Sequence, residues 1–178
     1  MQDKELYQHI LGLCTPWQVT DVKLDTSAQE IRVQVDHPRG TKFCCPDCSQ
    51  QLPYYDHGEE RQWRHLDSCQ FKTILVARVP RVQCPTHGVK SVAVPWTEPH
   101  SRFAMLFERL AIEVLQMTRT VQGAIAILRL EWDATWHLME RAVARGKARK
   151  ELSPLPRIGI GACAVIALCG SYSIVSTM

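Results

Sequence analysis

The first residues of the 178-residue chain lack the features of a secretory signal peptide. Acidic, basic and polar residues are mixed there, with no basic stretch that leads into an apolar run. We therefore expect a chain that stays in a reducing compartment, where disulfides rarely persist. The eight cysteines then do not indicate a disulfide scaffold. Outside a metal site, Cys14, Cys44 and Cys69 are expected to be small buried residues.

A strong net charge is also lacking, since the formal value is only +3. Residues 1–100 hold 11 Lys and Arg against 12 Asp and Glu, whereas residues 101–150 hold 9 against 5. The basic excess is concentrated at one end of the second segment, in Arg141, Arg145, Lys147, Arg149 and Lys150. It favours an anionic partner, but a solvated helix end followed by a basic linker explains the charge equally well.

No catalytic arrangement is apparent in the first hundred residues. His65 and Asp67 are residue types of a general base and its orienting acid, but the sequence places no nucleophile beside them. Both are therefore expected to be polar surface residues.

Two short turns with cysteine and histidine carry the strongest chemical signal. Two residues separate Cys45 from Cys48, and two separate Cys84 from His87, so each turn can present a pair of ligands to one ion. Thiolate sulfur and imidazole nitrogen are donors that tetrahedral zinc prefers. Gly88 follows the second pair and tolerates the left-handed backbone that such turns often need. The sequence predicts one structural zinc bound by Cys45, Cys48, Cys84 and His87.

Other ligand sets are open at this stage. Cys44 can replace Cys45, although the two-residue spacing favours Cys45. His57 or His65 can replace His87, but neither has a Cys or His partner separated from it by two residues, as His87 has in Cys84.

The first hundred residues are patterned for β-structure. Alternating runs at 22–24 and 31–35 flank a turn-like segment at 25–27 and so predict a hairpin. A longer strand is expected over 73–79, with Pro80 confining it to a sheet edge or a bend. We expect a small antiparallel sheet that zinc holds together.

The apolar period changes from two to 3.6 after two prolines that block both helix and central strand. Apolar positions between 103 and 115 predict a first helix, with Ser101 as its N-cap. A second helix is expected over 121–128, capped by Thr120, and a third over 135–142. The expected fold class is thus α+β, with a three-helix helix-turn-helix after the zinc-stapled sheet.

The connection between the last two helices, Arg129–Trp132, has the length found in helix-turn-helix motifs. In that motif the last helix enters the major groove through its N-terminal face. Here that face holds Trp132, Asp133, Trp136, His137 and Arg141. Arg129 stands where such turns favour Gly, so an L-residue at positive φ is expected. A plain three-helix bundle with both tryptophans in its core is the alternative.

Several stretches, taken together, resemble one family: Cys45-Pro-Asp-Cys48, Trp63-Arg-His-Leu-Asp67, residues 77–89, Val94-Pro-Trp96, and Trp132-Asp133 with residues 141–146. Their order is similar to that in the N-terminal half of bacterial insertion-sequence transposases of the ISL-three type. The resemblance implies a zinc-binding domain, a helix-turn-helix and then a DDE-type catalytic domain with a ribonuclease-H-like fold. It also implies Cys45, Cys48, Cys84 and His87 as zinc ligands. The implied partner is double-stranded DNA of the transposon terminal repeats, bound in the bacterial cytoplasm at the nucleoid.

The resemblance further implies a strand that leads into the first catalytic Asp. Residues 158–160 begin that pattern, but Gly161 stands at the position of the Asp, and residues 158–175 carry no charge. The carboxylates that would hold two divalent cations are therefore missing here. We expect a truncated or frameshifted start of the catalytic domain and no enzymatic activity. A membrane-anchoring tail is the alternative for the uncharged segment.

The function predicted from the sequence is a DNA-binding, non-catalytic N-terminal fragment of a transposase. The expected parts are a zinc-binding β domain at 1–100, a helix-turn-helix domain at 101–150 and the start of a catalytic domain at 151–178. The predicted DNA contacts are Trp132, Asp133, Trp136, His137, Arg141, Arg145, Lys147 and Arg149. The alternative is a zinc-organised protein-interaction module whose helices mediate dimerisation without DNA. The sequence leaves open whether the chain forms homo-oligomers, and no membrane partner is expected.

Overall fold

The computed structural model describes residues 3–118 and 120–149. The expected start of a catalytic domain at 151–178, including Gly161, lies outside these residues. One compact unit ends at Glu108 and a second begins at Arg109, and each is described by itself.

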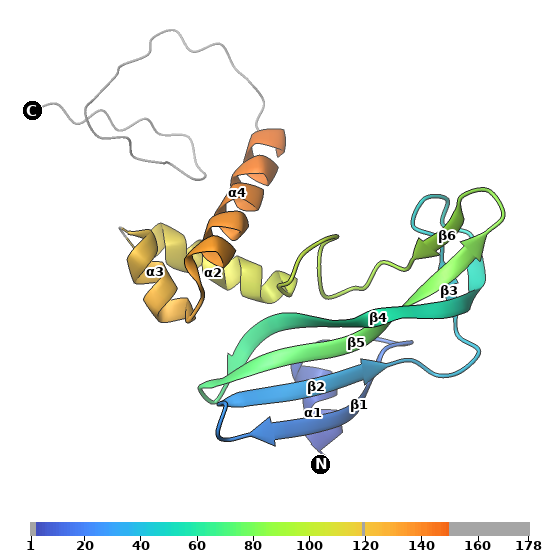
Figure 1. Ribbon diagram of the computed structural model, residues 1–178, viewed down its shortest axis with the longest axis horizontal. Helices are drawn as coiled ribbons and strands as arrows, with labels where there is room; N and C mark the ends of the chain where they lie inside the picture. The colour runs from blue at the N-terminus through green and yellow to red at the C-terminus, as the bar shows by residue number, and fades with distance from the viewer. Residues whose placement is uncertain (1–2, 119, 150–178) are drawn as a thin grey trace, which may run out of the picture. The chain divides into compact units, whose positions relative to one another are not determined.

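The first unit is a six-stranded sheet preceded by one helix (Figure 1). Its elements are α1 (Asp3–Ile10), β1 (Gln18–Asp25), β2 (Glu30–Asp36), β3 (Lys42–Cys44), β4 (Gln51–Ser68), β5 (Phe71–Cys84) and β6 (Gly88–Ser91). The strand order is β1-β2-β5-β4-β3, and β6 pairs with the end of β5. Helices and strands are both present, so the α+β class is confirmed.

The sheet is mixed, so the expectation of a purely antiparallel sheet was wrong. β2 pairs with β5 in parallel, from Glu30 opposite Lys72 to Gln34 opposite Val76, whereas the other pairings are antiparallel. Parallel neighbours need a long crossover connection. Residues 37–70, which include β3 and β4, form that connection, and β5 then lies between β2 and β4.

The hairpin expected near residues 22–35 is confirmed by the pairing of β1 with β2. Its turn is held by the Asp25 carboxylate, whose Oδ1 accepts the backbone N–H of Ser27 at 3.0 Å and of Ala28 at 2.9 Å. On β2, Val33 and Val35 are buried while Gln34 between them is not, as the alternating pattern requires. The local sequence therefore determines this hairpin.

β5 continues through Pro80, although the proline was expected to confine the strand to an edge or bend. Residues 72–76 pair with β2 and residues 81–84 pair with β6, so Pro80 lies between the two pairings. The ladder to β4 also shifts register between His57 and Glu60, close to the proline. A residue without an N–H is tolerated where no regular ladder needs it.

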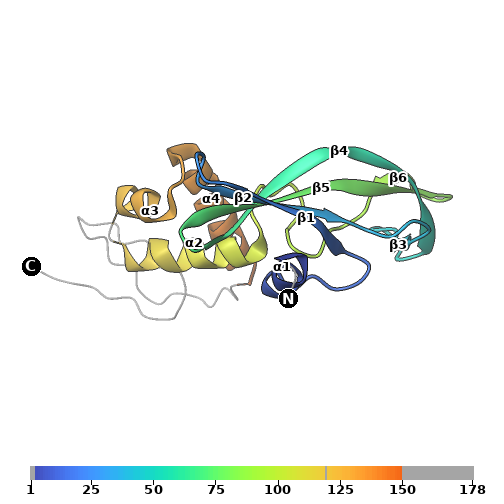
Figure 2. The ribbon, with the colours of Figure 1, turned by 90° about the horizontal axis from the view of Figure 1, so that it is seen from below.

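The core beneath the sheet is rich in tryptophan. The ring of Trp96 lies 4.9 Å from that of Trp17 and 5.5 Å from that of Trp63, both edge to face, a favourable arrangement of ring quadrupoles. Helix α1 packs against β1 on one side of the sheet (Figure 2). The Gln8 side chain ties α1 to the sheet, since its amide donates to the Trp17 carbonyl and its carbonyl accepts the Val19 N–H at 2.7 Å.

Of His65 and Asp67, both expected at the surface, only Asp67 is exposed. His65 lies on β4 and is only 4% exposed, so its expected surface position was wrong. Asp67 forms an ion pair with Arg64, whose guanidinium lies over the Phe107 ring at 5.3 Å from its centroid. Asp67 thus has a structural role, because its ion pair positions the Arg64 guanidinium over Phe107.

We expect the His65 ring to titrate below the ordinary histidine value of 6.5. Desolvation by burial lowers the pKa of His65, and a backbone hydrogen bond involving Leu66 offsets only part of that effect. The unfolded chain then binds the proton more readily, so this residue makes folding less favourable as pH falls through about 6.5. An NMR titration of the ring measures the midpoint, and a value of 6.5 or above would contradict the burial argument.

The second unit is helical. Helix α2 (Met105–Met117) crosses the boundary between the units, and α3 (Val121–Leu128) and α4 (Trp132–Arg149) follow. Among the described residues, no helix is both long and apolar enough to cross a membrane.

One of the two expected helix caps is present. Thr120 caps α3, because its side-chain oxygen accepts the Gly123 N–H at 3.1 Å. Ser101 was wrongly expected as the cap of α2, which begins four residues later, at Met105. Its hydroxyl instead accepts the Phe103 N–H and donates to the Glu108 carboxylate at 2.7 Å.

The turn between α3 and α4 has the strained backbone expected at Arg129. Arg129 has φ 53° and ψ 46°, and its N–H donates to the Ile125 carbonyl at the end of α3. A left-handed residue closes a helix end by satisfying a free carbonyl, and Gly occupies such positions at lowest cost.

Replacing Arg129 by Gly should therefore stabilise the α3–α4 turn, by about 1 kcal/mol at most, because the left-handed strain is removed. Replacing Ala126 by Gly, in the exposed interior of α3, should instead cost about 1 kcal/mol. Amide hydrogen exchange across α3 and α4 measures both effects. Faster exchange in the Arg129→Gly chain would indicate that its side chain contributes more than the backbone strain costs.

Candidate metal centre and nucleic-acid interface

The two ligand-bearing turns, here called knuckles (residues 45–48 and 84–87), meet at one end of the sheet. There the β3–β4 and β5–β6 turns lie close together (Figure 1). Cys45 and Cys48 follow β3, Cys84 ends β5, and His87 lies in the turn before β6. β4 pairs with both β3 and β5, and this pairing brings the two turns together. In the second turn, Gly88 adopts φ 70°, the left-handed backbone expected there.

The four side chains are arranged at distances suited to a tetrahedral ion. Their ligand atoms all lie within 4.8 Å of one another. The Sγ atoms of Cys48 and Cys84 are 3.7 Å apart, and Cys84 Sγ is 3.5 Å from His87 Nδ1. Ideal zinc bond lengths in a tetrahedron give about 3.8 Å between two sulfurs and about 3.6 Å between sulfur and nitrogen. The cluster of Cys45, Cys48, Cys84 and His87 therefore fits zinc binding.

The site is preformed by the backbone and by one ion pair. In the first knuckle, the Cys45 N–H donates to the Gln50 carbonyl and the Ser49 N–H to the Cys45 carbonyl, both at 2.9 Å. Lys90 on β6 reaches across to Asp47 in the first knuckle, with 2.9 Å between its Nζ and the carboxylate. The ion pair with Lys90 holds the pKa of Asp47 below its ordinary value. Sequence reasoning missed this link, because nothing local pairs the two residues.

Thiol acidity differs within the cluster. The His87 imidazole, followed by the Thr86 backbone, lowers the pKa of Cys84 to about 6. For Cys48, a backbone hydrogen bond involving Gln50 lowers the pKa, but desolvation and the neighbouring thiols outweigh it and raise the value. Since the thiolate is the metal-binding form, Cys84 is closer than Cys48 to its ligand state at neutral pH.

The alternative ligands lie elsewhere in the described residues. Cys44 is exposed and is not part of the cluster. His65 is buried on β4, and His57 belongs to a separate group with Asp36 and His37. The expected burial of the remaining cysteines was wrong, because the described structure exposes Cys14, Cys44 and Cys69.

The predicted DNA-contacting residues all lie on α4. Trp132 and Trp136 are 50% and 42% exposed and stack with ring planes 14° apart, so they are not core residues of a bundle. The remaining exposed positions are Asp133, His137, Lys147 and Arg149, whereas Arg141 and Arg145 are half-buried. Helix α4 thus carries exposed aromatic rings near its start and exposed basic groups near its end.

Comparison with known proteins relates the chain to transposases. Residues 41–87 match the zinc-finger of transposase IS204/IS1001/IS1096/IS1165. The chain is similar to the N-terminal part of an ISL-three-type transposase. It is 30% identical over 166 residues to "Transposase for insertion sequence element IS1557" of Mycobacterium tuberculosis, in strains CDC 1551 and H37Rv. The alignment covers 90% of this chain and 37% of each relative. No solved structure matches.

The charged groups of α4 differ between its two halves. Glu140 accepts a hydrogen bond from the Trp136 indole at 2.8 Å and lies 3.4 Å from the His137 ring. The N-terminal half of α4 therefore carries acidic as well as aromatic groups. Lys147 and Arg149 lie in its last turn, where cations also interact favourably with the helix dipole. The basic end of α4 is the part whose charge best suits a phosphate backbone.

Proposed function

We propose that this chain binds the DNA ends of an insertion sequence, using a zinc-stapled β unit and a helix-turn-helix. The similarity to a named transposase over 90% of the chain carries the proposal. Zinc would be held by Cys45, Cys48, Cys84 and His87, and would keep the two turns at the end of the sheet in one arrangement. The site would be structural, because four protein ligands leave no open coordination position.

In the helical part, α3 and α4 would form the motif, with α4 as the recognition helix. Three features support this: the left-handed turn at Arg129 between α3 and α4, the exposed tryptophans of α4 and the basic C-terminal half of α4. Arg141, Arg145, Lys147 and Arg149 would contact phosphates, and Trp132, Asp133, Trp136 and His137 would lie nearest the base edges. Phosphate contacts supply affinity, whereas base-edge contacts supply sequence preference.

The proposal assigns no catalytic step to this chain. DNA cleavage and strand transfer by two metal ions need converging carboxylates, and Gly161 stands at the position where the resemblance implies the first. The chain spans 37% of the length of its relatives. We further propose a cytoplasmic location at the nucleoid, as DNA binding requires.

A protein-interaction module is the second candidate. The stacked, exposed tryptophans and the neighbouring Glu140 on α4 favour it, because exposed aromatic rings commonly anchor protein interfaces. In this function the helices would mediate dimerisation, and the basic residues would only solvate the helix end.

Fluorescence anisotropy with two duplexes distinguishes the candidates. One duplex comes from the DNA that flanks the coding region, and the other has the same composition in scrambled order. DNA binding predicts that both bind at low salt, that the flanking duplex binds more tightly, and that affinity falls steeply with salt through counterion release. No binding at low salt, with a dimer in sedimentation analysis, would replace the proposal by the interaction module.

A further inference from the structure

A second group of potential metal ligands lies in the β unit, apart from the cysteine cluster. Asp36 ends β2, His37 follows it, and His57 lies on β4. Each residue offers one ligand atom, and these three atoms lie within 4.8 Å of one another. Two imidazoles and one carboxylate form a donor set that binds divalent first-row transition metals.

The two histidine rings already have nearly the spacing of ligands on one ion. Their Nε2 atoms are 2.9 Å apart, and the rings are nearly parallel, at 17°. Two imidazole nitrogens on a tetrahedral zinc lie about 3.3 Å apart, from metal–nitrogen bonds of about 2.0–2.1 Å. A movement of a few tenths of an ångström would therefore admit an ion.

The hydrogen bonds of His37 favour a tautomer that suits coordination. Its Nδ1 lies 3.1 Å from the Pro38 carbonyl, which can only accept a hydrogen bond. A proton on Nδ1 leaves the Nε2 lone pair of the neutral ring to accept a hydrogen bond from His57 Nε2–H, and an ion bound by both rings would replace that shared proton. Metal-binding histidines typically donate their other N–H to such a group, which fixes the orientation of the ring.

Aromatic packing holds His37 in place. Its ring meets the rings of Phe43, Tyr54 and Trp17 edge to face, at centroid distances of 4.8, 5.3 and 5.8 Å. The ring therefore loses little freedom on binding an ion, so the site is preorganised.

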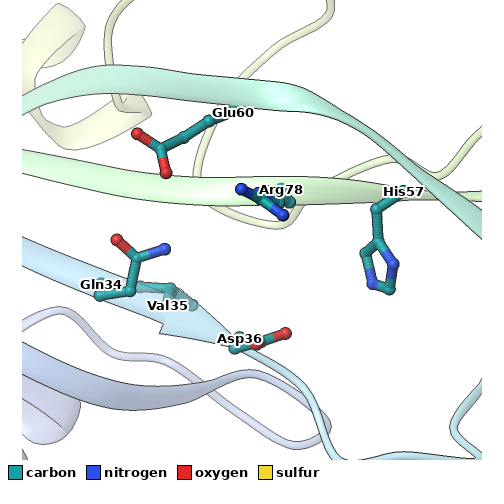
Figure 3. Close-up of a pocket in the computed structure, with 6 residues that line it drawn as sticks. All are labelled: Gln34, Val35, Asp36, His57, Glu60 and Arg78. Carbon is teal, nitrogen blue, oxygen red and sulfur yellow. The ribbon is translucent and has the colours of Figure 1, made fainter.

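The group borders a solvent-accessible hollow of about 390 Å³. Figure 3 shows Asp36 and His57 among the residues around this hollow, with Arg78 between His57 and Glu60. The carboxylates of Asp36 and Glu60 offset the guanidinium charge of Arg78, so a cation does not meet a purely basic surface. An ion can thus enter from solvent and keep water in an open coordination position.

We propose that Asp36, His37 and His57 form a second binding site for a divalent transition-metal ion such as Zn²⁺. The ion would join the end of β2 to β4 next to the register shift between His57 and Glu60. The site has fewer protein ligands than the cysteine cluster and lacks thiolates, so it binds metal more weakly and fills second.

Titration of the metal-free full-length chain with Co²⁺ and with Zn²⁺ tests the proposal. We expect two equivalents of either ion to bind. The first Co²⁺ gives thiolate-to-cobalt charge-transfer absorption, and the second adds none. In the His37→Gln and His57→Gln chains, the second equivalent is lost while the thiolate absorption remains. Asp36→Asn, a change at an exposed side chain, should weaken the second equivalent at least about tenfold, the loss typical even of an outer partner.

His9→Gln is the matched control, since His9 is exposed and lies outside the group. This chain should still bind two equivalents. The proposal is wrong if the native chain saturates at one equivalent, or if a His37→Gln/His57→Gln double variant with intact thiolate absorption still binds two. If a histidine variant fails to fold, the stoichiometry of the native chain and of the Asp36→Asn chain still decides.

Discussion

The Cys84→Ser chain is expected to lose its cysteine-bound zinc and to unfold over residues 40–95. Cys84 is buried, with its sulfur 3.7 Å from that of Cys48 and 3.5 Å from the His87 ring. Structural zinc contributes about 10–16 kcal/mol to the folding of small zinc domains, as much as the whole stability of a typical domain, about 5–15 kcal/mol. Metal analysis together with limited proteolysis of this segment measures the result.

Cys44→Ser is the matched control, because Cys44 is the neighbouring cysteine in sequence and lies outside the cluster. This chain should keep its zinc and its resistance to proteolysis. Thiolate-to-cobalt absorption separates the cysteine site from any metal held by histidines. If the Cys84→Ser chain keeps full thiolate absorption and a folded β unit, Cys84 is not a ligand.

The parts of the fold that the sequence predicts are those that depend on neighbouring residues. The β1–β2 hairpin follows from alternation and from the carboxylate of Asp25, which closes its own turn. The cap at Thr120 and the left-handed backbone at Arg129 depend on single positions beside a helix. The meeting of the knuckles was also predictable, because two half-sites with matching donors need one ion.

The parts that the sequence does not predict depend on distant pairing. Nothing local indicates that β5 pairs in parallel with β2, or that Pro80 lies between two pairings of one strand. His65 was predicted to lie at the surface because histidine is polar. The sequence did not show that its side chain is on an inward-facing part of β4. In α2, Leu106 and Leu110 belong to the apolar stripe but are 47% and 39% exposed. The apolar period predicts which face of a helix is hydrophobic, but it does not predict what covers that face.

The candidate sites show the same division. The cysteine cluster could be identified from spacing, whereas the Asp36–His37–His57 group could not, because the two histidines are 20 positions apart in the sequence. Only the shared neighbourhood of β2 and β4 around β5 brings them together. The chemistry of a metal site is thus legible in sequence when a turn supplies two ligands at once.

Replacing both Lys147 and Arg149 by Ala is expected to weaken DNA binding on every sequence and to flatten its salt dependence. Each lost phosphate contact should reduce the slope of log affinity against log salt by about 0.9 on duplex DNA. The two side chains are exposed at the end of α4, so their removal should leave the fold unchanged. Arg141→Ala/Arg145→Ala should flatten the slope similarly, but these half-buried residues also take part in other interactions.

Arg109→Ala is the control for a general loss of charge, because Arg109 is an exposed cation on α2 that pairs with Glu113. It should leave the slope unchanged.

His137→Ala should instead alter the preference between flanking and scrambled duplexes, since a side chain near base edges affects sequence discrimination more than total affinity. If the two double variants, Lys147→Ala/Arg149→Ala and Arg141→Ala/Arg145→Ala, keep the salt slope of the native chain, α4 does not contact phosphates. The helices would then be better explained as a protein interface.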